Sequence, residues 1–352
     1  MEPVFPIVAF KEVLTMKKAA VLGLAVFLTA VLTSCAPSTG VKSGAAAGEA
    51  LIKMMPKSST GIVAVDVQRL MGTEAIIKAL QEPKAKEKYD EFVKMSGIDP
   101  LKDITYVGIG LIGTPSGAAP DGGAIISLKY DRAKLQSLIK EKAPEVKEEL
   151  YNGVTVYSNI DGDSKQTTRA AFLDAGHIIL GSEKGVKGII DVQQKKAESL
   201  ARNAEMAAIL KKADKSGLGW GAFAVPQELL KKGIEANPQL KLLEGITAVT
   251  MSFDDRLNAV IADIRTIGGT KEQNTNLAST LNGFKAMGAM LGGQDPAVGE
   301  FQNGISITSG ENFTDLSLNV SHEVMDKIGK LAQSKAGDFM KSKKGEAPEV
   351  KK

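Results

Sequence analysis

The residue of this chain that is best placed for chemistry is its only cysteine, Cys35. A chain with one cysteine forms no internal disulfide, so a thiol in a secreted protein needs another role. Lys17 and Lys18 precede an uncharged run, Ala19 to Val31, that is rich in Leu, Val and Ala and ends just before this cysteine. The pattern is typical of a signal peptide, and the run is shorter than the roughly 20 residues that a transmembrane helix needs.

The apolar run ends in Leu32, Thr33, Ser34 and Cys35, and these four residues resemble the lipobox of bacterial lipoproteins. In that family an aliphatic residue and two small residues precede the cysteine. The resemblance implies that a diacylglyceryl group is attached to the Cys35 thiol, that a peptidase cuts before this cysteine, and that the new amine is often acylated. Two or three acyl chains hold a soluble domain firmly at a bilayer. Ala36, in place of Asp, favours the outer membrane in this family where one is present.

Two alternatives to lipidation stay open, namely an ordinary signal peptide with a chance cysteine and an uncleaved membrane anchor. Residues 1–15 carry two prolines and two glutamates ahead of the basic region, which is unusual for a signal peptide. We therefore expect Met16 to be the true start. A longer basic region that is lost with the rest is the alternative.

The two histidines, His177 and His322, are predicted to be structural or exposed. Neither lies in the sharp strand-to-helix turn that presents a hydrolase nucleophile, and a catalytic triad needs an imidazole beside a serine and a carboxylate. Two histidines and a lipidated cysteine are too few ligands for a zinc site. We expect no catalytic residue, no metal and no cofactor.

Three further patterns favour local structure over chemistry. Residues 161–164 lack the remaining ligands and the terminal Glu of a calcium loop, so we expect a turn. Asp254 and Asp255 are expected in a tight hairpin turn, where adjacent side chains diverge and make a poor acid–base pair. The glycines of residues 108–113 lack the spacing and the Lys-Ser/Thr of a phosphate loop, so we expect a strand that meets close neighbours.

A long helix is predicted from a capping box at Thr270 onward. Leu277, Leu281, Phe284 and Leu291 form its predicted inward stripe. Its last turns are rich in methionine, which adapts to irregular apolar surfaces. Two interpretations follow, an adaptable apolar groove and ordinary core packing, and the groove residues would be Met287, Met290 and Leu291.

The composition excludes several classes of partner. The formal net charge is +3, which is too balanced to indicate a nucleic acid or an acidic polymer. Apolar residues make up 43% of the chain, enough for a core, and aromatic residues only 5%, so Val, Ile, Leu and Ala should dominate that core.

Hydrophobic periodicity predicts an α+β fold made of two similar α+β halves, each ordered strand, helix, hairpin, helix, strands, helix. Mostly antiparallel sheets packed by helices are expected. The order loosely resembles uncharacterised bacterial secreted proteins with duplicated α+β halves, and no functional residue follows from that resemblance. The predicted segments are a signal peptide region (1–34), a flexible tether (35–50), a first unit (51–215), a second unit (216–334) and a lysine-rich disordered tail (335–352).

The leading hypothesis is a lipoprotein of the bacterial cell envelope with a non-enzymatic binding or scaffolding body. Its partners would be a membrane, through the lipid on Cys35, and an apolar small ligand or an envelope protein, with no nucleic acid. A carrier of a lipid or another apolar ligand is the first alternative, and a hydrolase of unrecognised type is the second. The tail would either contact anionic lipid or cell-wall polymer, or be merely solvated.

Overall fold

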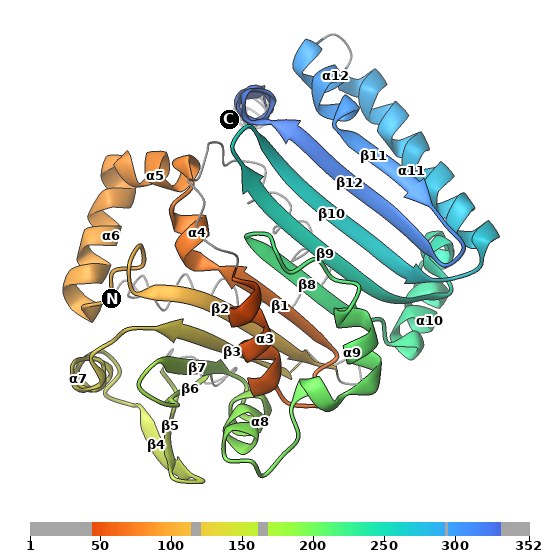
Figure 1. Cartoon of the computed structure of the whole chain (residues 1–352). Helices are drawn as coiled ribbons and strands as arrows, with labels where there is room; N and C mark the ends of the chain where they lie inside the picture. Colours follow the sequence, from red (N-terminus) through yellow and green to blue (C-terminus); the bar gives the residue numbers. More distant parts are fainter. Residues whose placement is uncertain (1–43, 114–120, 161–167, 293–294, 332–352) are drawn as a thin grey trace, which may run out of the picture.

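A single large antiparallel sheet organises the part of the chain that the computed structural model describes, residues 44–113, 121–160, 168–292 and 295–331 (Figure 1). The predicted α+β class, with antiparallel strands packed by helices, is confirmed. The strand order is β11-β12-β10-β9-β8-β1-β2-β3-β7-β6-β5-β4. The strands are β1 (Gly61–Asp66), β2 (Ile104–Ile112), β3 (Asp121–Leu128), β4 (Lys147–Tyr151), β5 (Val154–Ser158), β6 (Arg169–Phe172), β7 (His177–Gly181), β8 (Gly219–Ala224), β9 (Ile246–Arg256), β10 (Ala259–Gly268), β11 (Ile305–Ser309) and β12 (Phe313–Ser321).

The two predicted units share this sheet, where separate sheets had been expected. Strand β1 pairs with β8 in antiparallel register, with Val63 opposite Gly221. Outward from this pair the order is β1-β2-β3-β7-β6-β5-β4 on one side and β8-β9-β10-β12-β11 on the other. The similarity of the two units stays a prediction.

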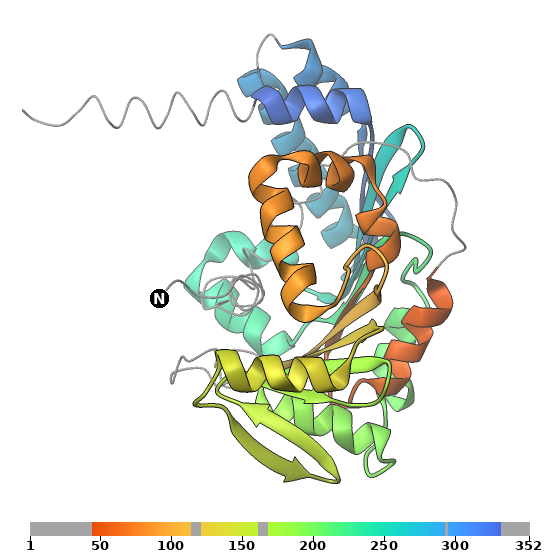
Figure 2. The same ribbon diagram turned by 90° about the vertical axis from the view of Figure 1, so that its left-hand side faces the viewer.

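Helices cover both faces of the sheet (Figure 2). The front face, toward the viewer in Figure 1, carries α3, α8 and α9, and Figure 2 shows α6, α7 and α10 on the back. A further helix of residues 322–331 follows β12. The labelled helices are α3 (Ala45–Met54), α4 (Val67–Met71), α5 (Glu74–Gln81), α6 (Pro83–Ser96), α7 (Arg132–Lys142), α8 (Glu183–Gln193), η1 (Leu200–Arg202), α9 (Ala204–Leu210), α10 (Gln227–Ala236), η2 (Pro238–Leu243), α11 (Lys271–Gly292) and α12 (Pro296–Asn303).

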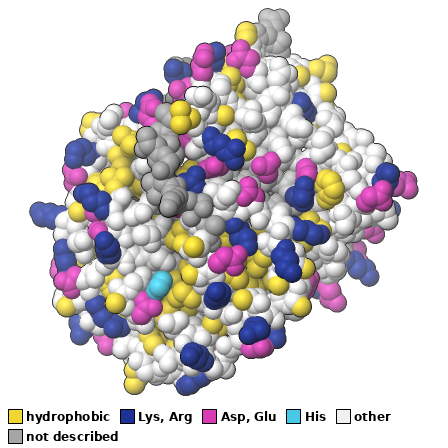
Figure 3. Space-filling model, in the orientation of Figure 1, with side chains coloured by type: hydrophobic (Ala, Val, Ile, Leu, Met, Phe, Trp, Pro, Cys, Tyr) yellow, Lys and Arg dark blue, Asp and Glu magenta, His cyan; other side chains and the backbone are white. Residues whose placement is uncertain are grey.

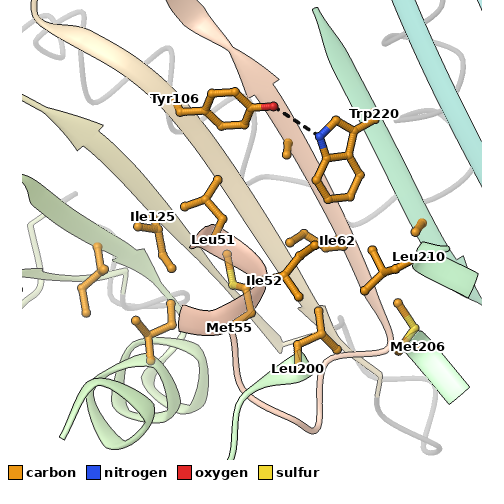
Figure 4. Packing of buried hydrophobic residues seen from close by; sticks show 14 of the residues in the cluster. Leu51, Ile52, Met55, Ile62, Tyr106, Ile125, Leu200, Met206, Leu210 and Trp220 are labelled. Atoms are coloured by element: carbon orange, nitrogen blue, oxygen red, sulfur yellow. Dashed lines mark hydrogen bonds between the residues drawn. The ribbon is translucent and has the colours of Figure 1, made fainter. Parts of the chain in front are cut away.

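The main core lies between the front face and its three helices (Figure 4). Trp220, the only tryptophan of the sequence, is fully buried, and its indole N–H donates to the Tyr106 hydroxyl at 3.2 Å. Burial raises the pKa of Tyr106, which keeps this phenol neutral. The bond links β2 with β8 and therefore ties the two predicted units together.

Glycines let helix α3 lie directly on strand β2. The predicted strand with close neighbours is confirmed, whereas the helix that lies on it was not predicted. A Cβ atom at Gly108 would lie 2.6 Å from Leu51 Cδ1, and one at Gly110 would lie 2.6 Å from Met55 Sδ. The side chains of Leu51 and of Met55, which follows the last residue of α3, are at most 1% exposed. Only a strand without side chains at these positions accepts the helix at this distance.

The predicted tether is wrong over its last residues, because α3 begins at Ala45 and the body therefore starts before residue 51. The three alanines at 45–47 favour a helix, because alanine has the highest helix propensity. Its Gly48 lies against Trp220, where a Cβ would be 3.0 Å from the ring. Residues 35–43 lie outside the described part of the chain.

Strand β4 was missed by the sequence patterns. Its five residues, KEELY, are largely charged and almost all exposed, so they show no apolar alternation. The strand forms because it pairs with β5 across a turn at Asn152 and Gly153, both with positive φ. An edge strand rich in charge is protected from pairing with other chains.

Two smaller cores cover the ends of the back face. Helices α6 and α7 pack on one end through a cluster that includes Ile126, Tyr157 and Phe172. At the other end, Val260 and Val320 pack with Met325 of the last helix. The middle of the back face lies between these two clusters.

Replacing Gly108 by Ala is expected to lower the free energy of unfolding by about 1–3 kcal/mol, because the added methyl overpacks the contact with Leu51. Chemical denaturation followed by circular dichroism measures it. Gly283, on α11, has nothing within 4 Å of its Cβ position, so Gly283→Ala should be neutral or stabilise by about 1 kcal/mol. Equal effects of the two variants would contradict the close packing of α3.

Candidate functional site

Both histidines pair with carboxylates in the described structure. The Nδ1 atom of His177 lies 2.8 Å from an oxygen of Asp174, three residues earlier in the same hairpin. The Nε2 atom of His322 lies 2.7 Å from Oδ1 of Asp255, and both of these side chains are largely buried. The second pair fastens the helix of residues 322–331 to strand β9.

The predicted position of Asp254 and Asp255 in a turn is wrong. Strand β9 continues to Arg256, and the turn consists of Leu257 and Asn258. Pairing with β10 extends the strand because Asp255 lies opposite Val260 in the antiparallel register.

Consecutive strand residues point to opposite faces, so the two carboxylates lie apart. Asp254 accepts a hydrogen bond from Arg69 Nη2 at 2.8 Å, and both side chains are only 14% exposed. Asp255 faces the other way and holds His322. The expectation that they make a poor acid–base pair therefore follows from the strand geometry, and each carboxylate stabilises a tertiary contact.

No group of three or more His, Cys, Asp or Glu side chains is arranged to hold a metal ion among the described residues. The candidate turn at 161–164, the lysine-rich tail and the lipobox residues Leu32, Thr33, Ser34 and Cys35 lie outside them. No helix within the described ranges has the length and the apolar character to cross a bilayer.

The most extended apolar feature is a row of side chains across the back face, which we call the back-face row. Each member lies opposite the next in the antiparallel registers, so the row crosses nine neighbouring strands from β11 to β7. In sheet order it consists of Ile307, Leu316, Ile264, Met251, Gly221, Val63, Ile109, Ala124 and Leu180. Gly221 has no side chain of its own, and the side chains of Phe223 and Met251 lie 2.8 Å and 3.0 Å from where its Cβ would be.

The back-face row is less buried than the front face of the same strands. Seven of its nine members are only half-buried; Met251 and Gly221 are the exceptions. On the front face, Ile62, Ala64 and Ala222 are fully buried under the helices. Contiguous apolar surface that stays accessible to water is costly and marks an interaction site. The back-face row is therefore the candidate binding site.

The predicted groove residues Met287 and Met290 lie on the surface of α11, 54% and 81% exposed. Phe284, predicted to face inward with Leu277, is 58% exposed, whereas Leu277 is buried. The side chain of Leu291 is outside the described set. The helix is held against β12 by its first turns, through Asn274 and Thr314, so only its N-terminal half follows the predicted stripe.

The described charged side chains that Figure 3 shows on the front face do not form a region of one sign. Figure 3 shows Lys and Arg interspersed with Asp and Glu over this surface, with hydrophobic side chains between them. This distribution agrees with the balanced net charge and gives no electrostatic footprint for a nucleic acid on this face.

Comparisons with known proteins give a family model and a few solved structures. The model described as "Protein of unknown function (DUF3352)" matches residues 130–282, from just after β3 into α11. No curated protein matches the chain. The chain is similar to crystal form III of TP0453, with 11% identity and a TM-score of 0.46 over 82% of this chain and 98% of that one. It is also similar to crystal form I of TP0453, with 10% identity and a TM-score of 0.44 over 79% and 95%.

Replacing Asp254 by Ala is expected to destabilise the fold by about 3 kcal/mol, because it leaves the largely buried Arg69 without its carboxylate. Urea denaturation measures the change. Arg256 also contacts Asp254 but is 61% exposed, so Arg256→Ala should cost less than about 0.5 kcal/mol. A small effect at Asp254 would show that the ion pair does not fasten α4 to β9.

Proposed function

We propose that this chain is a lipid-anchored protein of the bacterial cell envelope whose body binds a partner without catalysing a reaction. The resemblance of Leu32, Thr33, Ser34 and Cys35 to a lipobox supports the anchor, together with the absence of any other cysteine from the sequence. On this proposal the mature protein begins at Cys35, and Ala36 directs it to an outer membrane where one exists.

The half-buried back-face row is the observation that supports the proposed binding of a partner. Leu316, Ile264, Val63 and Ile109 place apolar side chains side by side on the less covered face of the sheet. Burying this surface against an apolar partner would recover roughly 25 cal/mol for each Å² removed from water.

A carrier of a lipid or another apolar small ligand is the second candidate, and the same row favours it. The row runs across the strands, so an extended acyl chain that lies along it would meet an apolar side chain at about every 4.8 Å, except at Gly221, where the side chains of Phe223 and Met251 lie close by. The hydrolase alternative would need convergent polar groups, and the described His and Asp pairs are instead engaged in tertiary contacts through His322 and Asp254.

Replacing Cys35 by Ser is expected to release the protein from the membrane fraction of the producing bacterium, because the acyl chains have no thiol to attach to. Membrane fractionation and intact-mass measurement check it. Ser34→Ala keeps a small residue before the cysteine and should leave the protein anchored. Unchanged fractionation of the Cys35→Ser protein would defeat the proposal.

Replacing Ile264 by Lys is expected to weaken binding of the fluorescent fatty acid cis-parinaric acid at least tenfold, because it puts a charge into the back-face row. Titration of the purified protein measures the binding. Asp263 is adjacent, exposed and on the opposite face of β10, so Asp263→Lys is the matched control and should bind normally. Circular dichroism of both variants checks the fold, and equal affinities would exclude the row as an acyl-chain site.

A further inference from the structure

Six neighbouring strands have one of their ends on the same side of the sheet. We call this row of strand ends the anchor-side edge, which differs from the outermost strands β4 and β11. Strands β1, β9 and β12 end there, and β8, β10 and β11 begin there. The registers show this directly, since Ala259 lies opposite both Arg256 and Ser321, and Gly219 lies opposite both Val65 and Phe253.

The described chain enters the body at this edge. Gly44 precedes α3 and lies against the last residue of β1, so that a Cβ on Gly44 would be 2.7 Å from Asp66 Oδ2. Eight residues lie between Cys35 and Gly44, and the nine residue steps that join these two Cα atoms span at most about 30 Å. A lipid on Cys35 would therefore hold this edge within that distance of the bilayer surface.

Helix α11 brings apolar side chains to the same edge. Near its start, the Asn274 amide group contacts Thr314, far from this edge. In its second half, Lys285 Nζ donates to the carbonyl of Ile305, the first residue of β11. The helix therefore runs along β11 toward the anchor-side edge and ends there (Figure 1). Its exposed apolar residues Phe284, Met287 and Met290 lie on this last part.

The turn between β9 and β10 adds another exposed apolar side chain at this edge, Leu257, which is 64% exposed. Six strands about 4.8 Å apart put β11 about 24 Å from β1. The C-terminal end of α11, beside β11, is therefore about as far from Gly44, measured across the strands, as Cys35 can be.

The chemistry of this surface fits a lipid interface. Residues 281–292 contain one charged residue, Lys285, and its ammonium group already donates to a backbone carbonyl. Helices that lie at a bilayer surface place Phe, Leu and similar side chains at the boundary between headgroups and acyl chains. Because a short tether keeps the local lipid concentration high, a weak apolar contact suffices for docking.

We propose that the anchor-side edge docks on the bilayer that holds Cys35, with Phe284, Met287 and Met290 of α11 and Leu257 in contact with lipid. This inference rests on the proposed anchoring. It adds an orientation, in which the anchor-side edge faces the membrane. Strand β4, the charged outermost strand at the other end of the sheet, is then far from the bilayer (Figure 1).

The single cysteine of the chain makes the orientation measurable. Once Cys35 is lipidated, Met290→Cys provides the only free thiol of the full chain, and Leu150→Cys provides a matched control. Leu150 is a 74% exposed apolar residue on β4, at the far edge of the sheet. Each lipidated protein is labelled with bimane and reconstituted into phosphatidylcholine–phosphatidylglycerol vesicles with or without brominated phosphatidylcholine.

The bimane emission at position 290 is expected to fall by roughly half with brominated lipid, since interfacial helices enter the headgroup boundary by about 5–10 Å. The emission at position 150 should not change. Vesicle flotation is measured on the same samples. Protein that floats without preferential quenching at 290 overturns the docking and leaves the anchor intact, whereas protein that does not float defeats the anchoring and this inference together.

A second variant separates lipid contact from self-association. Phe284→Asp with Met287→Asp, in the Met290→Cys background, is expected to abolish the quenching while flotation is retained. If quenching at 290 is absent and the labelled protein sediments as a dimer, a second copy of the chain covers this face, and the lipid assignment is wrong.

Discussion

The pairing of β1 with β8 is the contact on which the rest of the structure depends. It joins strands that are about 160 residues apart in the chain into one sheet, with Val63 opposite Gly221. The buried hydrogen bond from Trp220 to Tyr106 lies beside it, and helix α3 covers both residues. Without this pair, the front-face helices would have no common surface to cover and the main core would divide in two.

The two faces of this sheet are packed to different degrees, and this difference is the basis for the proposed function. On the front face, glycines at 108 and 110 admit α3 so closely that Leu51 and Met55 lose contact with water. On the back face, the covering helices stand over the two ends, and the row through Ile264 and Ile109 stays half-buried. Among the described residues, the front face is therefore the closely packed one, and the back-face row is the apolar surface on which the proposed binding rests.

The polar side chains of Asp254, Asp255 and His322 stabilise contacts between helices and the sheet. Arg69 with Asp254 ties α4 to β9, and His322 with Asp255 ties the last helix to the same strand. Both ties lie at the anchor-side edge, where the chain also enters. On the proposed anchoring, the edge nearest the membrane is therefore also the one where the Arg69–Asp254 ion pair and the His322–Asp255 hydrogen bond fasten helices to the sheet.

The sequence by itself determined the features that depend on neighbouring residues. The antiparallel hairpins and the capping box at Thr270 follow from local propensity and spacing. The lipobox pattern ending at Cys35 is of the same kind, and its outcome stays a prediction. Only the tertiary structure decided the β1–β8 pairing, the opposite directions of Asp254 and Asp255, and the exposure of Phe284. These depend on which distant strand or helix lies alongside, and a helical stripe is the same in sequence whether a partner covers it or water does.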